Sequence, residues 1–334
     1  MKAQCSLAFA TLLAAMSTAA AEDVVLLTSG NRLIGEVREL SRGELTFSID
    51  GAGSVDIDWR NIVELRSTQT FYVELASGER HTGPVAVTAG QLTIATAAGS
   101  QRVDVGDVFR IDPMSASTLR DRLSGSIDVG FDFLSANDEI DWTLNATAEH
   151  RTTRQLTELS LNSLLRRRDD TTDQRRNYLE IGSRRYFDNR WFVLGQLHLE
   201  EDRELDLDSR VLLGAALGRT LSQSHRAVFS LYGGVDADRE KFLGFGTDTL
   251  FEVHGAMEWD WFDVGGDTEL DFKATTYYAP EESRTRVEVQ ANLRRDIAND
   301  FYWALYVYES YNSDPPEDLE KSDLGVAITI GRDF

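Results

Sequence analysis

The chain has 334 residues, with 34 Lys and Arg against 56 Asp and Glu, a formal net charge of −22 and a single cysteine. Acidity this strong argues against nucleic-acid partners, because phosphate binding needs clustered Lys and Arg. The cysteine, Cys5, lies in the expected leader, so disulfide, cysteine-metal and cysteine-nucleophile chemistry are excluded for the mature chain, and we expect no cofactor.

The first 21 residues have the pattern of a secretory signal peptide. Lys2 supplies the positive end, Leu7 to Met16 form an apolar stretch, and Ala19-Ala20-Ala21 offers a small-residue cleavage site. An apolar stretch of about 10 residues is too short for a membrane-spanning helix, which needs ~20. We therefore expect residues 1–21 to be removed on export.

Residues 22–111 contain two copies of one unit. Ser29-Gly30 and Gly35 in the first copy recur 48 residues later as Ser77-Gly78 and Gly83. Between these marks lie short alternating runs separated by Gly-rich turns, which is typical of small β-domains. The pattern predicts two strongly bent sheets that resemble SH3-like or Sm-like barrels.

The composition of this repeat region bears on its partner. It holds 8 Arg and no Lys against 14 Asp and Glu in residues 22–112, which argues against RNA binding. A periplasmic module that contacts another envelope component and a plain structural spacer both remain open, and the sequence identifies no partner. Residues 112–122, with Pro113 and a Ser-Ala run, predict a linker.

Residues 123–334 contain twelve segments with apolar side chains on one parity and polar or small ones on the other. Alternation of this kind also suits a soluble periplasmic β-protein, but the connections favour a membrane barrel. The odd-numbered connections, such as 166–176 and 236–247, are polar and run from about 6 to 12 residues, whereas the even-numbered ones run from about 3 to 7. Long outer loops and short periplasmic turns are typical of outer-membrane barrels.

Aromatic residues gather near both ends of these segments, which also favours a membrane. Phe251, Tyr277 and Tyr278 lie near the long connections, and Trp191 and Trp259 lie near the short ones. Tyr and Trp prefer the interface between lipid and water. The fold class predicted is all-β: an antiparallel transmembrane barrel of about 12 strands, preceded by the two repeats.

The C-terminal segment resembles the assembly signal of bacterial outer-membrane barrels. Its apolar face carries Val326, Ile328 and Ile330 and ends on Phe334. The resemblance implies that the outer-membrane assembly machinery and outer-membrane lipid are partners. With an even strand number both chain ends fall on the short-turn side, so we expect an outer-membrane protein with its N-terminal region in the periplasm.

Acidic side chains on the polar parity are expected to face the barrel lumen. If the lumen holds water, rings of carboxylates favour cations; if it is filled, the same residues form a salt-bridged interior that conducts nothing. Twelve strands leave this choice open. The candidate lumen acids are Asp128, Asp132, Asp141, Glu252, Glu269 and Asp271.

A basic stretch in the 166–176 connection is a second candidate site. Guanidinium groups there are suited to pair lipopolysaccharide phosphates on the outer side, although an exposed loop without a partner fits equally well. The candidate lipopolysaccharide contacts are Arg166, Arg167, Arg168, Arg175 and Arg176.

The sequence shows no convincing catalytic constellation. A lipid-modifying, phospholipase-like enzyme needs a His beside a Ser on the lipid face. His150 is the one histidine expected on that face, and no evident Ser accompanies it. No zinc or calcium motif is present, so no metal site is expected.

The whole layout resembles a known family. A leader, the segment VLLTSGNRLIGEV…GELTF…VDIDWRNIVEL and an alternating region ending in Phe are similar to the salt-induced outer-membrane proteins of domain-of-unknown-function family 481. The resemblance implies an outer-membrane barrel of unassigned activity and transfers no site residues. We therefore expect a non-enzymatic envelope protein with a structural or weakly cation-selective channel role; the lipid-modifying enzyme and the soluble periplasmic β-protein are the alternatives.

Overall fold

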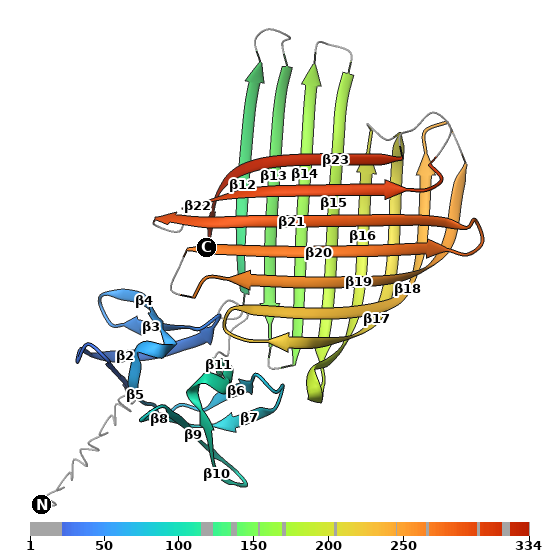
Figure 1. Ribbon diagram of the computed structural model, residues 1–334. Coiled ribbons are helices and arrows are strands. Elements are labelled where there is room, and N and C mark those ends of the chain that lie inside the picture. The colour runs from blue at the N-terminus through green and yellow to red at the C-terminus, as the bar shows by residue number, and fades with distance from the viewer. Residues whose placement is uncertain are drawn as a thin grey trace, which may run out of the picture.

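The computed structural model describes residues 22–114, 123–134, 139–152, 154–168, 172–203, 206–244, 246–264, 267–298, 301–315 and 321–333. These residues form two β-units, an N-terminal module and a barrel (Figure 1). The predicted leader, residues 115–122 of the predicted linker, and Phe334 lie outside the described residues. No helix within the described ranges is long and apolar enough to cross a membrane.

The module is one sheet system with two short 3₁₀ turns. The strand order is β10-β9-β8-β5-β1-β2-β11-β6-β7, and β3 and β4 extend from β2. The elements are β1 (Asp23–Leu27), β2 (Arg32–Ser41), β3 (Glu44–Ile49), β4 (Gly53–Asp58), η1 (Trp59–Asn61), β5 (Ile62–Arg66), β6 (Phe71–Leu75), β7 (Arg80–Gly83), β8 (Val85–Thr88), β9 (Gln91–Thr96), β10 (Gly99–Asp104), η2 (Val105–Asp107) and β11 (Val108–Pro113).

The two repeats interlock through their last strands. β5 pairs with β1 of its own repeat and with β8 of the other, while β11 pairs with β6 of its own repeat and with β2 of the other. Leu65 on β5 and Ile111 on β11 are fully buried in a single apolar core that both repeats share. A bent sheet of about 45 residues buries little apolar surface by itself, so sharing a core is the physically favourable arrangement.

The recurring glycines mark the tightest points of each repeat. A Cβ on Gly35 would collide with the carbonyl oxygen of Ser48, and one on Gly83 would collide with that of Ala95. The turn glycines Gly30 and Gly78 both have φ +85°, a conformation that side-chain-bearing residues rarely adopt. The repeat in the sequence therefore reflects a repeat in backbone geometry.

The second unit is a closed antiparallel barrel of twelve strands, as predicted, in which each strand lies beside its sequence neighbours. The strands are β12 (Leu123–Leu134), β13 (Glu139–Arg151), β14 (Gln155–Arg168), β15 (Thr172–Tyr186), β16 (Trp191–Asp202), β17 (Leu207–Gln223), β18 (Ala227–Phe242), β19 (Thr247–Phe262), β20 (Thr268–Ala279), β21 (Arg284–Ala298), β22 (Phe301–Asn312) and β23 (Ser322–Asp333).

The predicted long connections are mostly wrong. The 166–176 stretch is strand except for 169–171, and 236–247 is strand up to Phe242. Charged residues in these stretches predict loop, but they continue the strand ladder; Lys241 on β18, for example, bonds Asp208 on β17 at 2.7 Å. By the strand ends that the structure describes, the β22–β23 connection, residues 313–321, is the one that stays long.

The barrel wall separates apolar and polar side chains by parity. Leu213 is 64% exposed on the outer face, whereas its neighbour Leu212 is 2% exposed on the inner face. Among the aromatic residues, Phe251 (63% exposed) and Trp259 (40% exposed) face outward. Tyr277 faces inward at 2% exposure, so its predicted place among the interfacial aromatics is wrong: strand parity, not position along the strand, decides its side.

Candidate functional site

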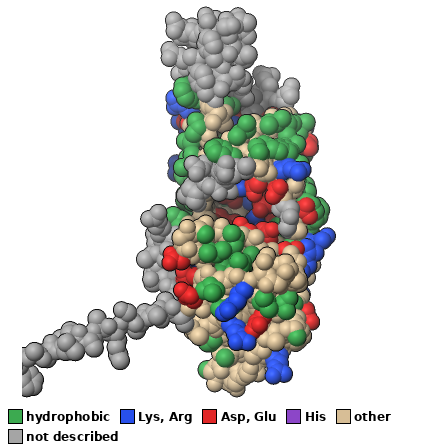
Figure 2. Space-filling view, turned by 90° about the vertical axis from the view of Figure 1, so that its left-hand side faces the viewer, with side chains coloured by type: hydrophobic (Ala, Val, Ile, Leu, Met, Phe, Trp, Pro, Cys, Tyr) green, Lys and Arg blue, Asp and Glu red, His purple; other side chains and the backbone are tan. Residues whose placement is uncertain are grey.

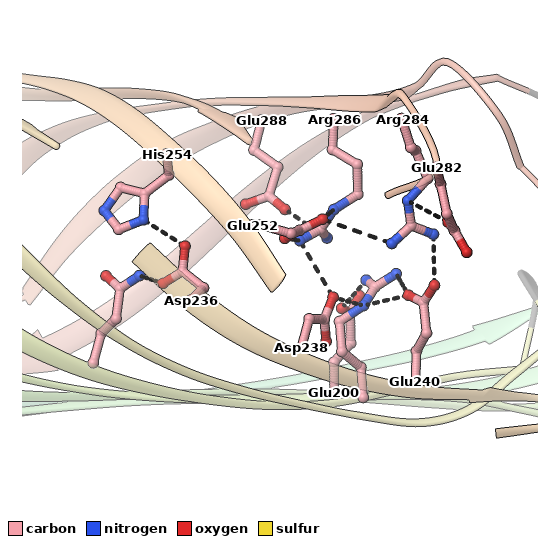
Figure 3. Close-up of polar contacts among 12 residues, drawn as sticks. Glu200, Asp236, Asp238, Glu240, Glu252, His254, Glu282, Arg284, Arg286 and Glu288 are labelled. Atoms are coloured by element: carbon pink, nitrogen blue, oxygen red, sulfur yellow. Dashed lines mark hydrogen bonds and ion pairs between the residues drawn. The ribbon is translucent and has the colours of Figure 1, made fainter. Parts of the chain in front are cut away.

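The barrel interior carries a cluster of charged side chains near the ends of β17, β18, β19 and β21. We call it the arginine cluster. Its guanidinium groups come from β17 and β21 and its carboxylates from β16, β18 and β19, and most of these residues are labelled in Figure 3. The members are Glu200, Arg210, Asp238, Glu240, Glu252, Arg284 and Arg286.

The arginine cluster joins strands that are not neighbours. Arg284 on β21 reaches Glu240 on β18 with Nη1 2.5 Å from Oε1 (Figure 3). Arg286, also on β21, lies 2.6 Å from Glu252 and 3.4 Å from Asp238. Two strands separate β18 from β21 in the barrel order, so these ion pairs cross the interior and do not follow the wall.

A second set of contacts crosses the interior closer to its middle. Arg184 on β15 pairs with Glu258 on β19 at 2.8 Å. Lys273 on β20 pairs with Glu180 on β15 at 3.1 Å. These contacts join β15 to β19 and β20 on the opposite side of the barrel, so a single pair of side chains spans the interior between them.

The exposure of these charges shows that this part of the interior is packed. Asp238 is 0% exposed, Glu252 2% and Arg286 5%. Charged groups that line a water-filled channel stay accessible, whereas groups this buried must be paired, because an isolated buried charge is very unfavourable. The interior formed by β16 to β21 is therefore held together by ion pairs.

A histidine and an aspartate form a pair deeper in the same wall. The His254 Nδ1 lies within hydrogen-bond distance of Asp236, whose other oxygen accepts from Gln196 at 3.0 Å. Tyr232 and Tyr277 flank the His254 ring. The pair looks like part of a catalytic triad, but both side chains are 0% exposed, so no substrate reaches them in this structure.

The opposite part of the interior, formed by β12, β13 and β23, is lined by small side chains. Thr147 and Ala327 are exposed there, and Asn145 and Thr329 are half-exposed. The rings of β22 tyrosines lie over the β23 glycines. Tyr308 lies so close to Gly325 that a Cβ at that position would collide with its ring. The interior thus has a packed side and an accessible side.

The candidate lumen acids are divided between these two sides and the barrel mouth. Glu252 belongs to the arginine cluster, while Asp128 accepts from the Tyr302 hydroxyl at 2.7 Å on the accessible side. Glu269 and Asp271 face inward at the short-turn end. Asp132 and Asp141 lie opposite each other on β12 and β13, and the structure does not describe their side chains.

The module lies against the short-turn end of the barrel. Arg80 donates to the Phe187 carbonyl at 3.0 Å, Gln223 donates to the Leu75 carbonyl at 2.9 Å, and His225 contacts the Val108 carbonyl. Arg42 reaches the mouth acid Glu269. Figure 2 shows acidic side chains around a hollow at this end of the barrel, directly above the module.

Electrostatics at this junction favour a charged Arg42. Its guanidinium faces Glu269, Asp271 and Glu149, and although desolvation by burial opposes the shift, these carboxylates raise the pKa of Arg42 above its usual value. A crevice of about 270 Å³ lies beside this contact, lined by Arg60, Gly106, Ser224, His225, Arg226 and Val264.

The predicted lipopolysaccharide contacts do not share one surface. Arg166, Arg167 and Arg168 end β14, and the structure does not describe their side chains. Arg175 is exposed on β15. Arg176 points inward, where it pairs with Asp202 at 3.3 Å and contacts Tyr308, so its guanidinium does not face an outer ligand in this structure.

The remaining sequence-derived residues are placed on the outer face. Val326, Ile328 and Ile330 are 65%, 75% and 68% exposed on β23. His150 lies on β13 opposite Leu123 and Thr157. No three His, Cys, Asp or Glu side chains in the described ranges group as a metal site.

The sequence reading missed the centre of the arginine cluster. Asp236, Asp238 and Glu240 lie in the 236–247 stretch that the sequence predicts as a connection, whereas the structure places them on β18, and Arg284 begins β21. A signal was available: these three acids share the parity of the buried residues Tyr232 and Ser230, so the β18 alternation continues through them.

Comparisons with known proteins agree on family and architecture. The model of a family described as "Protein of unknown function, DUF481" matches residues 127–334. No curated protein matches the chain. The structure is similar to the NanC porin (11% identity, TM-score 0.38, 63% of this chain and 98% of that one) and to a second porin (10%, 0.30, 94% and 98%). At these TM-scores the two porins add nothing to the barrel seen directly in the strand pairing.

Proposed function

Since the chain belongs to the DUF481 family, we propose that it is a non-enzymatic outer-membrane barrel with a structural role in the envelope. Its barrel interior is closed to ion flow, and its module lies in the periplasm. The observation that carries this proposal is the set of ion pairs that cross the interior, from the buried pair of Arg286 and Asp238 to the partly buried pair of Lys273 and Glu180.

The outer face supports a membrane location. Exposed aliphatic side chains cover it on successive strands, among them Leu213, Val235 and Ile328 at 64%, 61% and 75%. An apolar belt of this extent is unfavourable in water and favourable in lipid. The exposed rings of Trp191 and Phe301 near the short turns suit the interface between lipid and water.

The structural role is supported by the cost of opening the interior. Ion flow through the packed side would require the pairs across β15, β19 and β20 to separate and their charges to rehydrate, and on the accessible side the rings of Tyr302 and Tyr308 lie over the β23 glycines. Removing one partner of a fully buried pair costs ~3–5 kcal/mol. The pairs made by β15 are partly buried and contribute less each, but several would have to separate at once. The acidic mouth near Glu269 favours cations locally, but it leads into this paired region.

Conductance of planar bilayers tests the closed interior. The mature protein is first shown to be folded by its resistance to unfolding in detergent without heating. It is then inserted into the bilayer under a KCl gradient, with a general porin as positive control. We expect no regular current steps. Steady cation-selective steps would replace the structural role with that of a channel.

Cysteine labelling in whole cells tests the orientation. The only native cysteine is Cys5, in the expected leader, so single-cysteine variants give clean signals. Asp314→Cys, on the long β22–β23 connection, should react with a membrane-impermeant maleimide in intact cells. Ala52→Cys, in an exposed turn of the module, should react only after permeabilisation. Labelling of Ala52→Cys in intact cells would contradict a periplasmic module.

A further inference from the structure

The barrel is closed unevenly at the seam where its first and last strands meet. Among the residues that the structure describes, β12 pairs with β23 only at Ser126↔Asp333 and Ile127↔Arg332. Every other pair of neighbouring barrel strands is joined along most of its length, as β22 and β23 are from Phe301↔Arg332 to Tyr311↔Ser322. Figure 1 shows β12 and β23 diverging from their joined ends.

The seam therefore leaves two strand edges without a ladder. If the register continued, Asp128 would lie opposite Gly331 and Gly130 opposite Thr329. The Asp128 carboxylate still lies against Gly331, but beyond it the described residues 129–134 have ladder partners only on β13, and 322–330 have them only on β22. In a bilayer an unpaired backbone N–H or C=O is unfavourable, so these edges need hydrogen-bonding groups from elsewhere.

The inner side of the seam is the accessible side of the interior. Inward side chains on β23 are small (Gly325, Ala327, Thr329), and Ala327 is exposed. The facing residues on β13, Asn145 and Thr147, are also accessible. On the packed side, inward residues such as Asp238 and Glu252 are buried, so the accessible space inside the barrel lies beside the seam.

The outer side of the seam is apolar. Leu324, Val326, Ile328 and Ile330 on β23 are 65–75% exposed, and Val129 on β12 is 66% exposed. These side chains continue the apolar belt up to the opening itself. A molecule that enters there comes from the hydrocarbon surroundings, and it meets small hydroxyl and amide side chains inside.

We propose that the seam is a lateral opening that admits an acyl chain of a bilayer lipid into the accessible side of the interior. The chain lies against Ala327 and Thr329 of β23, between the rings of Tyr308 and Tyr302 that cover Gly325 and Gly331. The ester oxygens of the lipid accept hydrogen bonds from the free edge N–H groups. This proposal rests on the membrane location proposed above. It differs from a pore because the path leads sideways into the bilayer and not along the barrel axis.

A lipid fits the seam better than a second copy of the chain does. A strand added to either edge would have to branch from the ladder that joins Ile127 to Arg332. An acyl chain needs no such junction, and the apolar belt is continuous with the opening. Pairing with a second copy is instead an outcome that the tests below detect.

Fluorescence quenching by brominated lipid is the first test. Single-cysteine variants labelled with bimane are placed in phosphatidylcholine vesicles with or without bromine on the acyl chains. Ala327→Cys reports the inner side of the seam, Ile328→Cys the outer face one residue away, and Gly182→Cys the inner face of β15, where a Cβ meets only Leu194 at 3.8 Å.

We expect bromine to quench Ala327→Cys to at least half the extent of Ile328→Cys and to leave Gly182→Cys nearly unchanged. An unquenched Ala327→Cys beside a quenched Ile328→Cys would overturn the lateral opening and leave the membrane location intact. Absence of quenching at Ile328→Cys would instead overturn the membrane location.

Disulfide formation is the second test. The pair Gly130→Cys and Thr329→Cys lies across the open part of the seam, and the matched pair Ser126→Cys and Thr147→Cys lies across a closed ladder, where the native hydroxyls are 2.8 Å apart. We expect the control pair to oxidise at least tenfold faster. Equal rates would show a closed seam, and disulfide-linked dimers through Gly130→Cys would show a second copy at the edge; either result overturns the proposal.

Discussion

The module and the barrel are both β-structures, yet they place their polar side chains on opposite sides. The module buries an apolar core that includes Leu65, Phe71 and Ile111, and it exposes most of its charges, with Asp23 as a buried exception. The barrel buries charges such as Asp238 and Arg286 and exposes Leu213 and Ile328. In the module, burial of apolar groups drives folding; in the barrel, charges inside a low-dielectric space must be paired one by one.

The largest expected effect is the loss of one buried charge in the barrel. Arg286→Ala removes the partner of Glu252 and Asp238, and breaking such a pair costs ~3–5 kcal/mol because the carboxylates stay buried. Urea unfolding of the barrel in lipid vesicles measures the change. Arg239→Ala, an exposed arginine on the same wall, is the control and should change stability by less than ~0.5 kcal/mol. Similar values for both variants would mean that water reaches the arginine cluster.

The matching change in the module removes an apolar group. Leu65→Ala leaves a cavity where both repeats meet and should cost ~2–5 kcal/mol. Near-ultraviolet circular dichroism follows the module through the buried Trp59, whose Nε1 donates to the Val105 carbonyl at 2.8 Å. The barrel transition should stay in place. If the barrel also lost stability by that amount, the two units would not fold independently, and the contrast between apolar burial in the module and charge pairing in the barrel would not hold.

A smaller effect is expected where the two units touch. Arg42→Ala removes the contact with Glu269 and the stacking of the guanidinium 5.2 Å from the centre of the Phe262 ring. Half-exposed contacts of this kind contribute about 1 kcal/mol. We expect faster trypsin cleavage between module and barrel and unchanged unfolding of each unit. Arg38→Ala, which loses only the exposed pair with Glu36, should leave the cleavage rate as it is.

The smallest effect is a pH dependence confined to the module. Hydrogen bonds from Arg60 hold the pKa of Asp58 below its usual value, so the folded module favours the ionised carboxylate. This contribution is complete above the unfolded-state pKa and is lost as pH falls through the lowered folded-state pKa. Asp58→Asn should flatten the acid limb of module stability, measured by unfolding between pH 2 and 6. If the variant lost stability at low pH as the native module does, the pH dependence would come from other carboxylates.

The sequence predicted the parts of the fold that depend on local alternation. The twelve strands, the inward position of Glu252 and the outward position of Ile328 follow from side-chain parity alone. Strand ends did not, because the composition of residues 236–240 predicts a loop although their parity continues that of Tyr232; the ion pair of Glu240 with Arg284 shows how such charges are accommodated inside. The interlocking of β5 and β11 with the other repeat was also not predictable, since parity says which face is buried but not against which strand.

The exchange of last strands has a consequence for how the module arose. β5 completes the sheet of the second repeat through Leu65↔Val87, and β11 completes the sheet of the first through Ile111↔Leu40. Two separate chains of one repeat each could make the same exchange, which is the topology of a strand-swapped homodimer with two-fold symmetry. The module therefore has the architecture of a strand-swapped homodimer whose two subunits are joined in one polypeptide. A single repeat, expressed alone, is expected to form a dimer.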